Sequence, residues 1–509
     1  MSSGNIRAVA RAAWLSDAQV VLAASGDTST NGRTTRRARR WRVEARAGLD
    51  APRRQAAGIS RDPGGDRPRR PGPDRRTGTD EQMGTAMSAP ALADRVEIDL
   101  DVYNPYDIES VENPYPVFGK LIADYPVAFH REINAWMVSR HDLIAEILRD
   151  TRFSTNFADW NNAPKPKPRS EWTLYDQQQS MSMGTVPPAA HMRLRRLTAP
   201  AFSRRVMDQI EDRIRDSVAG IFDEIDDPRE FDAATDIAAK VPIRAIARMV
   251  GVPAESETLF EHGLGWNLVR ASNPLYSAQQ RAQYAEGALP GLQYLLDTVA
   301  ERRRSPGDHD DFLGTLLATE VDGEQLTDWE IVSVITALVT AGADTAVDLH
   351  TLTLRALLTH PEQWALLRAR PDLMESVILE VLRWGGHGKF GAIPRFPRED
   401  VEIGGQLLEK GSHVMLMFSA AGLDPAKWSD PLLFDVTRNH AGNIIFGAGP
   451  HLCIGLNLVK VQGKLMIEEF ERRFGDSARI AGQIEYDPSH FNARRISRLP
   501  ISTARGGRS

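Results

Sequence analysis

The amino-acid sequence predicts a mainly α-helical protein with small β-sheets. Long segments with helical apolar spacing follow one another from residue 188 to 384, whereas strand-like segments are short and few. A chain of 509 residues with 42% hydrophobic residues can bury a large core. Its only cysteine, Cys453, excludes an intrachain disulfide and a zinc site that needs two or more cysteines. No run of about 18 apolar residues occurs, so we expect no membrane span and a cytoplasmic location.

Residues 1–90 differ from the rest of the chain in composition. Residues 1–80 contain 17 Arg, no Lys and 8 acidic residues, and Gly and Pro are frequent without an apolar period. Such a segment cannot bury enough apolar surface to fold alone, so we expect it to be disordered. A basic nucleic-acid-binding arm and an Arg-rich transit peptide are two interpretations. We favour a third, in which translation begins at Met83 or Met87 and residues 91–509 form the folded domain.

The folded part is expected to begin with a helix, a pair of strands and a second helix, at residues 113–126, 127–140 and 141–150. Residues 155–187 are polar and irregular, and a loop of this length usually has a function. Helical patterns then cover residues 188–202, 205–226, 232–250, 255–271, 278–304, 327–358 and 371–384. The last strands are expected at 400–414, around a Gly-Gly turn, and in the C-terminal "RRISRLPIST".

The single cysteine lies in a glycine-rich stretch, "FGAGPHLCIG", at residues 446–455. A lone buried cysteine usually acts as a small hydrophobic residue. Such a role does not require glycines at 447, 449 and 455. Glycines at this density let the backbone turn tightly or lie against a flat or bulky group. This loop is therefore the first candidate site.

A second candidate is the apolar stretch "IVSVITALVTAGADT" at residues 331–345. A helix this apolar should run through the core. Asp344 and Thr345 are then costly unless they are paired or functional. A threonine hydroxyl that bonds back to the preceding turn is the simplest structural alternative.

Two charged pairs complete the set of motifs. Glu380 and Arg383 are i,i+3 neighbours in "ESVILEVLRW", and His191 and Arg195 are i,i+4 neighbours in "HMRLRRLTAPAF". Taken alone, each pair is also compatible with a solvated helix surface.

Together and in this order, the four motifs resemble the cytochrome P450 family, in its soluble bacterial form. The family pattern F-G-x-G-x-x-x-C-x-G is complete in "FGAGPHLCIG". The resemblance covers about residues 100–505 and includes "NPYPVF" and "PREDVEIGG". It implies the cytochrome P450 fold, with haem between a long central helix and the loop and helix that carry the cysteine ligand. Gly422 and Leu423 stand where the family often has Asn and Arg, which affects the scaffold rather than the chemistry.

The resemblance also implies roles for individual residues. The cofactor would be heme b (iron protoporphyrin IX), with Cys453 as the thiolate ligand of the iron. Other cofactor contacts would come from His191, Arg195, Arg395, Phe446, Gly447, His451 and Gly455. A structural ion network would join Glu380, Arg383 and Arg438. Asp344 and Thr345 would manage the protons that dioxygen activation consumes.

The implied reaction inserts one oxygen atom of O2 into an apolar small molecule, by hydroxylation or epoxidation of a terpenoid, steroid, aromatic or polyketide-type compound. We expect the substrate pocket to include Trp172, Trp266, Leu338, Ala341, Ile393 and Phe491. Asn267 and Arg270 would contact a polar group of the substrate or lie at the surface.

Electrons would reach a monomeric enzyme from NAD(P)H through ferredoxin reductase and ferredoxin, with no nucleic-acid or membrane partner. Arg193, Arg196, Lys460 and Lys464 are candidates for a basic docking face, although such charges are often only solvated. Two alternatives remain. A peroxide-driven peroxygenase typically has another pair in place of the acid and alcohol, and a non-catalytic haem-binding sensor would not need them.

Overall fold

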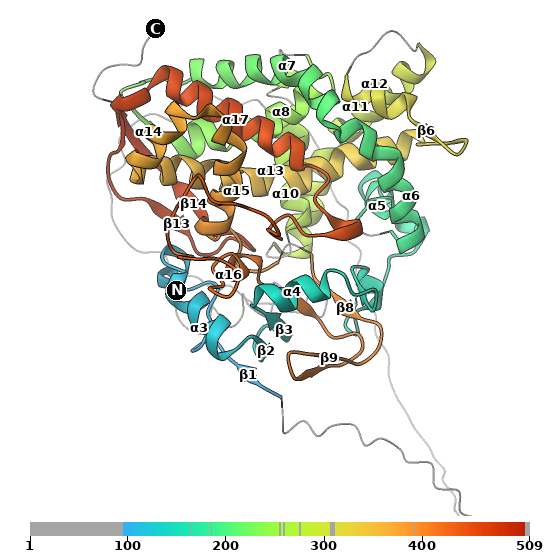
Figure 1. Cartoon of the computed structure of the whole chain (residues 1–509). Coiled ribbons are helices and arrows are strands. Elements are labelled where there is room, and N and C mark those ends of the chain that lie inside the picture. The colour runs from blue at the N-terminus through green and yellow to red at the C-terminus, as the bar shows by residue number, and fades with distance from the viewer. Residues whose placement is uncertain are drawn as a thin grey trace, which may run out of the picture. The chain divides into compact units, whose positions relative to one another are not determined.

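The computed structural model describes residues 95–503 except 164, 185, 254–255, 258–259, 274–275, 306–310 and 392. The expectations for residues 1–90 lie outside this range. In the described part, helices dominate and the strands form sheets of two to four strands (Figure 1). The predicted fold class, mainly α with small β-sheets, is confirmed.

The helices fall into three groups along the chain. The first group is α2 (Ile108–Glu112), α3 (Tyr115–Asp124) and α4 (His141–Ile147). The second is α5 (Leu174–Ser180), α6 (Pro188–Thr198), α7 (Arg204–Asp223), α8 (Val241–Met249), α10 (Trp266–Ser272), α11 (Ala278–Arg304), α12 (Phe312–Ala318) and α13 (Asp328–Thr359). The third is α14 (Pro361–Ala369), α15 (Met374–Gly385), α16 (Phe418–Ala421) and α17 (Leu456–Arg473).

The strands pair across long sequence distances. The four-stranded sheet has the order β1 (Glu97–Ile98), β2 (Val127–His130), β3 (Ala135–Val138), β11 (Val414–Leu416), and only its central pair is antiparallel. An antiparallel sheet of three has the order β12 (Ala478–Ile480), β15 (Pro500–Thr503), β5 (Glu230–Asp232). Antiparallel pairs are β4 (Phe153–Ser154) with β8 (Phe396–Pro397), β6 (Glu320–Val321) with β7 (Glu324–Gln325), β9 (Val401–Ile403) with β10 (Gln406–Leu408), and β13 (Glu485–Asp487) with β14 (Arg495–Arg498).

Helix α13 is the central element that positions the site. It begins at a capping box, in which Thr327 and Glu330 bond each other's backbone N–H groups. It contacts α8, α10, α11, α15 and α17, and Figure 1 shows it running across the middle of the helical part. In the described part it is the one helix long and apolar enough to cross a membrane. Because 61% of its apolar window is buried inside the protein, it has the character of a core helix.

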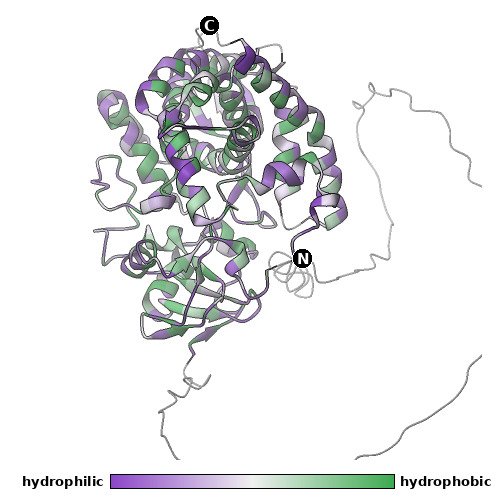
Figure 2. Cartoon of the chain, turned by 90° about the vertical axis from the view of Figure 1, so that its right-hand side faces the viewer, coloured by the Kyte–Doolittle hydropathy of each residue, from purple (hydrophilic) through white to green (hydrophobic). Residues whose placement is uncertain are grey.

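The hydrophobic core follows the division between helices and sheets. The largest cluster joins helices from α6 to α17, and two smaller clusters lie around the four-stranded sheet and the helices α3 and α4. Figure 2 shows helices that are hydrophobic on one side and hydrophilic on the other. This amphipathic pattern is what made the helices recognisable in the sequence.

Two segments differ from the sequence-based expectation. The polar stretch 155–187 contains α5, which Thr173 and Asp176 begin through a capping box. Residues 232–250 were expected to form one helix. Instead, β5 pairs with the distant β15, a π-helical turn follows, and α8 starts only next to Pro242. A strand whose partner is far away in the sequence leaves no local signal, so this difference has a tertiary cause.

Candidate functional site

The cysteine loop folds back on itself immediately before α17. Gly447 and Gly449 have φ angles of +76° and +63°, a region that favours glycine. A Cβ atom at 447 would lie 3.2 Å from the carbonyl oxygen of His451. The Cys453 N–H donates to the Phe446 carbonyl at 2.9 Å and closes the loop. These glycines therefore allow a turn that presents Cys453 at its end.

The thiol of Cys453 lies at the start of α17, and Cys453 is an exposed residue. Desolvation raises the pKa of this thiol, while the Gly455 N–H and the charge of Arg195 act to lower it. The positive end of the α17 dipole also faces this region. The surroundings therefore supply several groups that would stabilise a sulfur anion once a counter-charge is present.

Four basic side chains from three segments lie beside the cysteine loop. The rings of His191, on α6, and His451 stack with centroids 4.3 Å apart. Arg195, also on α6, donates to the carbonyl of Leu452, next to the cysteine. Burial lowers the pKa of Arg395 to about 10, and Arg395 donates only to backbone carbonyls of its own segment.

This basic group lacks an anion among the described residues. None of its four members forms an ion pair with a carboxylate there, although most other Arg residues in the same range do. Desolvation and, after it, the charges of His191, Arg395 and Arg195 together lower the pKa of His451 to about 4. A cluster of this kind is suited to bind carboxylates supplied by a ligand.

In the middle of α13, Ala341 and Thr345 are exposed although most residues toward both ends of the helix are buried. The Thr345 hydroxyl donates to the Ala341 carbonyl at 2.9 Å. Thr351 and Thr353 make the same contact to their preceding turn, but both are buried. The simple structural alternative for Thr345 is thus present, and its exposure is what distinguishes it.

The neighbouring Asp344 is held by residues of the hairpin that β13 and β14 form near the C-terminus, here called the C-terminal hairpin. Arg495, on β14, donates to its Oδ1 at 2.7 Å, and Nε2 of His490 lies 3.2 Å from its Oδ2. Arg495 also pairs with Asp348, one turn further along α13. Burial alone would raise the pKa of Asp344, but the contacts with His490 and Arg495 outweigh it and hold this pKa well below its usual range.

Arg495 and His490 were not expected as partners of Asp344, and neither was Asp348 as a second acid bound by the same arginine. Asp344 and Asp348 are one helical turn apart in an apolar helix, and two carboxylates on such a face require a cation. That requirement was the available signal. It did not reveal that the cation would be Arg495, which lies 147 residues beyond Asp348.

The predicted network of Glu380, Arg383 and Arg438 is present. Arg383 binds both carboxylate oxygens of Glu380 at 2.7 Å, and Arg438 Nε lies 3.2 Å from Oε1. Glu380 and Arg383 are completely buried. The two arginines also donate to carbonyls of the segment that leads to the cysteine loop, at Gly422, Ser429, Asp430, Pro431 and Leu433.

The residues predicted to line a substrate pocket come from separate segments. Leu338 is buried in the main hydrophobic cluster, and Trp266, at the start of α10, packs against that cluster. Ile393 is exposed and Phe491 is half-buried in the turn between β13 and β14. Trp172 instead donates to the Lys167 carbonyl within its own loop.

The two predicted polar contacts of this region have protein partners. Asn267 donates to the carbonyls of His262 and Gly263, and Arg270 lies over the ring of Tyr284, 5.6 Å from its centroid. The Asn267 amide therefore already has hydrogen-bond partners in the protein, and the Arg270 guanidinium lies against a ring.

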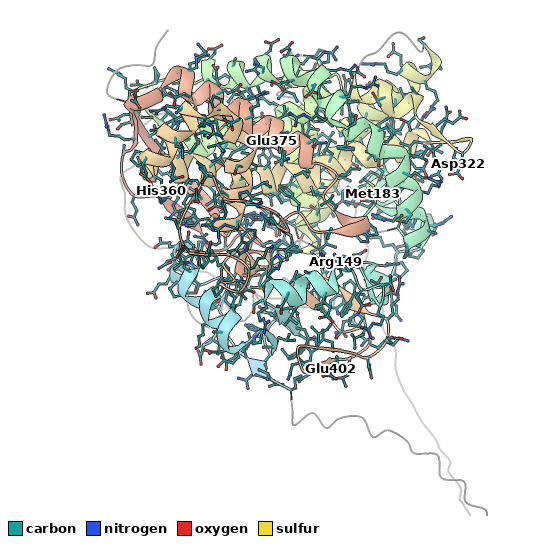
Figure 3. The ribbon with its side chains drawn as sticks, viewed as in Figure 1. Arg149, Met183, Asp322, His360, Glu375 and Glu402 are labelled. Carbon is teal, nitrogen blue, oxygen red and sulfur yellow. The ribbon has the colours of Figure 1, made fainter. Side chains whose placement is uncertain are left out.

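The four bases proposed for a docking face do not form an uncompensated positive surface, because each is paired with a carboxylate. Figure 3 labels two of these acids, Asp322 on the β6–β7 hairpin and Glu375 on α15. The pairs are Arg193 with Glu324 and Glu330, Arg196 with Asp322, Lys460 with Glu375, and Lys464 with Glu211.

Comparison with known proteins assigns this arrangement to a family of enzymes. The family model of cytochrome P450 matches residues 280–475. The epothilone C/D epoxidase of Sorangium cellulosum is 30% identical over 403 residues, which cover 78% of this chain and 92% of the epoxidase. The 6-deoxyerythronolide B hydroxylase of Saccharopolyspora erythraea is 32% identical over 373 residues, 71% of this chain and 88% of the hydroxylase.

A solved structure, epothilone B-bound cytochrome P450epoK, superposes with a TM-score of 0.70 and 27% identity, over 79% of this chain and all of that one. The chain belongs to the cytochrome P450 family. It is a monooxygenase of the bacterial type, as the resemblance in the sequence implied.

The residues around Cys453 fit the haem-thiolate cofactor of this family. One accessible thiol lies at the positive end of a helix, and a backbone N–H donates to its sulfur. Four basic groups without a carboxylate partner in the described part match the two acidic side chains of a haem. The exposed surface at Ala341 and Thr345 gives a long helix on which a flat ligand can lie.

Proposed function

We propose that this chain is a haem-thiolate monooxygenase that inserts one oxygen atom of O2 into an apolar small molecule, by hydroxylation or epoxidation. Its cofactor is heme b and its electrons come from NAD(P)H through a ferredoxin. The observation that carries the proposal is the single thiol of Cys453, presented by a glycine turn beside a basic cluster that lacks an anion in the described chain.

In this proposal Cys453 binds the haem iron, and the bound haem supplies the activation of dioxygen. The Gly455 N–H hydrogen-bonds the sulfur and moderates its charge. Gly447 lets the loop fold back tightly before Cys453, because a side chain there would meet the His451 carbonyl. Phe446, whose carbonyl accepts the Cys453 N–H, would lie on the sulfur side of the bound haem.

The basic cluster holds the haem carboxylates. His191, Arg195, Arg395 and His451 converge from α6, the cysteine loop and the segment before β8. Arginine binds a carboxylate with two parallel N–H groups, which fixes orientation as well as charge. Desolvation is the main cause of the low pKa of His451, and two bound carboxylates would offset the added repulsion from His191, Arg395 and Arg195.

Asp344 and Thr345 manage the protons of the reaction. Thr345 is exposed, and rotation of its side chain would exchange the bond to the Ala341 carbonyl for a bond to a water molecule that carries a proton. Asp344 is next to it on the helix and keeps some contact with solvent, since 29% of its side chain is exposed. General acid catalysis of this kind contributes typically ~10²–10⁴-fold.

The substrate is an apolar compound of the terpenoid, steroid, aromatic or polyketide type. Support comes from the side chains of Leu338, Trp266 and Ile393, and from the committed hydrogen bonds of Asn267. Relatives named for epothilones, for 6-deoxyerythronolide B and for vitamin D(3) act on large, mainly apolar molecules. A compound library screened for the optical shift that follows loss of iron-bound water would identify the ligand class.

A ferredoxin and its reductase are the proposed electron donors, acting on a cytoplasmic monomer. Because the four nearby bases are already paired, docking would use the exposed apolar side chains of Met192 and Leu452 beside Arg195. Leu452 directly precedes Cys453, so this surface lies close to the proposed iron ligand. Docking of this kind should depend less on salt than docking on free basic groups.

The first test concerns the thiolate. The reduced, carbon monoxide-bound protein is expected to show the red-shifted Soret band of thiolate ligation, and Cys453→Ala should lose the band and the activity together. Leu452→Ala, at the exposed neighbour, should keep the band. Retention of both band and activity in Cys453→Ala would refute the assignment.

A second test separates the enzyme classes. Product is measured with NADH, reductase and ferredoxin, and in parallel with hydrogen peroxide alone. The proposal expects turnover in the first reaction and little in the second. Turnover with hydrogen peroxide alone would establish a peroxygenase. If the haem-loaded protein gives no product in either reaction, a haem-binding sensor would be favoured.

The proposal places all of this chemistry in residues 91–509, since the solved relative is covered completely by 79% of the chain. Expression from Met87 should therefore give haem-loaded, active enzyme. Loss of folding on that truncation would show that the preceding segment contributes to the domain.

A further inference from the structure

Two carboxylates on one face of α13 share a single guanidinium. Asp348 is 1% exposed, and Nε of Arg495 lies 2.5 Å from its Oδ1. The Nη2 of the same arginine donates to Oδ1 of Asp344 at 2.7 Å and to the Asp344 backbone carbonyl at 2.9 Å. Arg495 therefore spans one helical turn, anchored at the buried acid and reaching the partly exposed one.

The second oxygen of Asp344 is held by His490. The ring nitrogen Nδ1 of His490 accepts the backbone N–H of Ala493 at 3.0 Å. An acceptor nitrogen carries no proton in the neutral ring, so the proton is on Nε2. That nitrogen lies 3.2 Å from Oδ2 of Asp344 and donates to it. Both carboxylate oxygens are thus oriented by the C-terminal hairpin.

Asp348 and Asp344 differ in solvent exposure, and a group that passes protons on must be the exposed one. Asp348 is sealed, and a buried carboxylate keeps its counter-ion because separation is very costly. Asp344 has 29% of its side chain exposed and adjoins Thr345. Arg495 can consequently release Asp344 while it stays bound to Asp348.

We propose that Arg495 and His490 are positioning residues that hold the Asp344 carboxylate ionised beside Thr345 and set how readily it takes up the proton that it passes on. This inference rests on the proposed function, in which Asp344 handles protons. The low pKa of Asp344 agrees with it, because every proton that arrives must compete with a cation and a hydrogen-bond donor.

The contacts of Arg495 and His490 with Asp344, here called the clamp, lie among further charged groups of the described part. Lys389 donates to the carbonyls of His490 and Pro488, and Asp487 accepts the backbone N–H of His490 through its own carbonyl. Among the described residues, the titratable and charged groups near the clamp on α13, β13, β14 and the segment after α15 include Asp344, Asp348, Tyr486, Asp487, His387, Lys389, Arg494 and Arg495. The substitutions used in the test leave β13 and the segment after α15 unchanged.

The test compares three variants with a control on the same strand. His490→Leu removes the donor, His490→Gln retains an N–H, and the double variant Asp348→Asn, Arg495→Gln removes the cation without leaving a buried charge alone. Arg498→Gln is the control, since Arg498 is exposed and pairs only with Glu485 on β13. Product formed per NADH is measured against pH in the holoenzyme.

A weaker clamp lets Asp344 keep its proton to higher pH. Product formed per NADH is expected to fall as rising pH removes the proton from Asp344. In His490→Leu and in the double variant, the pH at which this ratio has fallen to half should therefore be higher by about one unit, a tenfold change in proton affinity. His490→Gln and Arg498→Gln should match the unmodified enzyme. Unchanged profiles in both clamp variants, with normal haem content, would overturn the proposal.

A spectroscopic measurement does not depend on turnover. In the diamagnetic, carbon monoxide-bound reduced holoenzyme, the ¹⁵N signals of His490, assigned by their absence in His490→Gln, should report a protonated Nε2 and an acceptor Nδ1. Asp344→Asn should shift the Nε2 signal. The opposite tautomer, or no shift, would show that the contact is absent. If Asp344→Asn instead shifts the signal but leaves product per NADH unchanged, the proton role of Asp344 fails rather than the contact.

Discussion

Two carboxylates, Glu380 and Asp344, are each held by an arginine, yet their surroundings differ. Glu380 is completely buried and its oxygens accept from Arg383, Arg438 and the backbone N–H of Asp435. Asp344 is held by Arg495 and His490 but keeps 29% of its side chain exposed. A sealed pair can only fix structure, whereas a pair at an edge can also exchange protons.

The comparison explains what each pair does for the cysteine loop. Arg383 and Arg438 donate to carbonyls of the segment before that loop, so the sealed network holds the backbone behind Cys453. The partly exposed pair instead joins Asp344 on α13, next to the exposed Thr345, to Arg495 on β14. We therefore expect changes in the first to affect folding and haem retention, and changes in the second to affect product formation.

The largest effect is expected on the free energy of unfolding, at the buried pair of Glu380 and Arg383. Arg383→Met leaves the buried carboxylate of Glu380 without its bidentate partner, and breaking a buried pair costs about 3–5 kcal/mol. Denaturant unfolding should show a loss of this size together with loss of bound haem. Arg370→Met, at an exposed pair with Asp372, is the control and should change little. Equal stability of the two variants would contradict the structural role.

The next largest effect is expected on product formation at Thr345, with the fold unchanged. Thr345→Ala should keep the haem spectrum and NADH consumption, while product falls and hydrogen peroxide rises, because proton delivery of this kind is worth ~10²-fold or more. Product and peroxide are measured per NADH in one reaction. Thr353→Ala is the control, because it removes a buried hydroxyl that donates to the preceding turn of the same helix. It should leave the ratio of product to peroxide unchanged. An unchanged ratio in Thr345→Ala would return that residue to a structural role.

A smaller effect is expected on the pH dependence of stability. The pKa of Asp344 is lower in the folded chain than its ordinary value, so its contribution is present above about pH 4 and is lost as the pH falls below that value. The free energy of unfolding of Asp344→Asn should therefore fall less between pH 5 and pH 3 than that of the unmodified protein. Asp101→Asn, at an exposed position, should follow the unmodified protein. Parallel curves for all three would show that the clamp does not stabilise the fold.

The smallest effect is expected at the solvent-exposed ion pairs. Lys464 pairs with Glu211, and its side chain is 38% exposed. Such pairs contribute about 0–1 kcal/mol. Lys464→Ala should hardly change stability or the salt dependence of electron transfer from ferredoxin, whereas Met192→Ala should weaken ferredoxin binding. A marked loss of ferredoxin binding in Lys464→Ala alone would restore the basic docking face.

The sequence predicted the parts of the site that short spacings encode. The glycine turn before Cys453, the i,i+3 pair of Glu380 and Arg383, and the apolar helix with Asp344 are local patterns, and each was found where expected. Their assignment to one family also came from these patterns.

The parts that could not be predicted depend on partners far apart in the chain. Arg495 meets Asp348 across 147 residues, and β5 finds its partner β15 only in the folded protein. The pairing of Lys464 with Glu211, from α17 to α7, likewise neutralises a charge that looked free in the sequence. Helix α5 is different, since the capping residues Thr173 and Asp176 were a local signal that was overlooked.

The position of the single thiol has a practical consequence. Cys453 is the only cysteine of the chain and is exposed beside the glycine turn. An alkylating reagent should thus find one accessible sulfur in each chain that lacks cofactor, and none where iron occupies it. Mass spectrometry after such labelling would count empty molecules directly, and would measure cofactor loading in a preparation without reference to colour, substrate or redox partner.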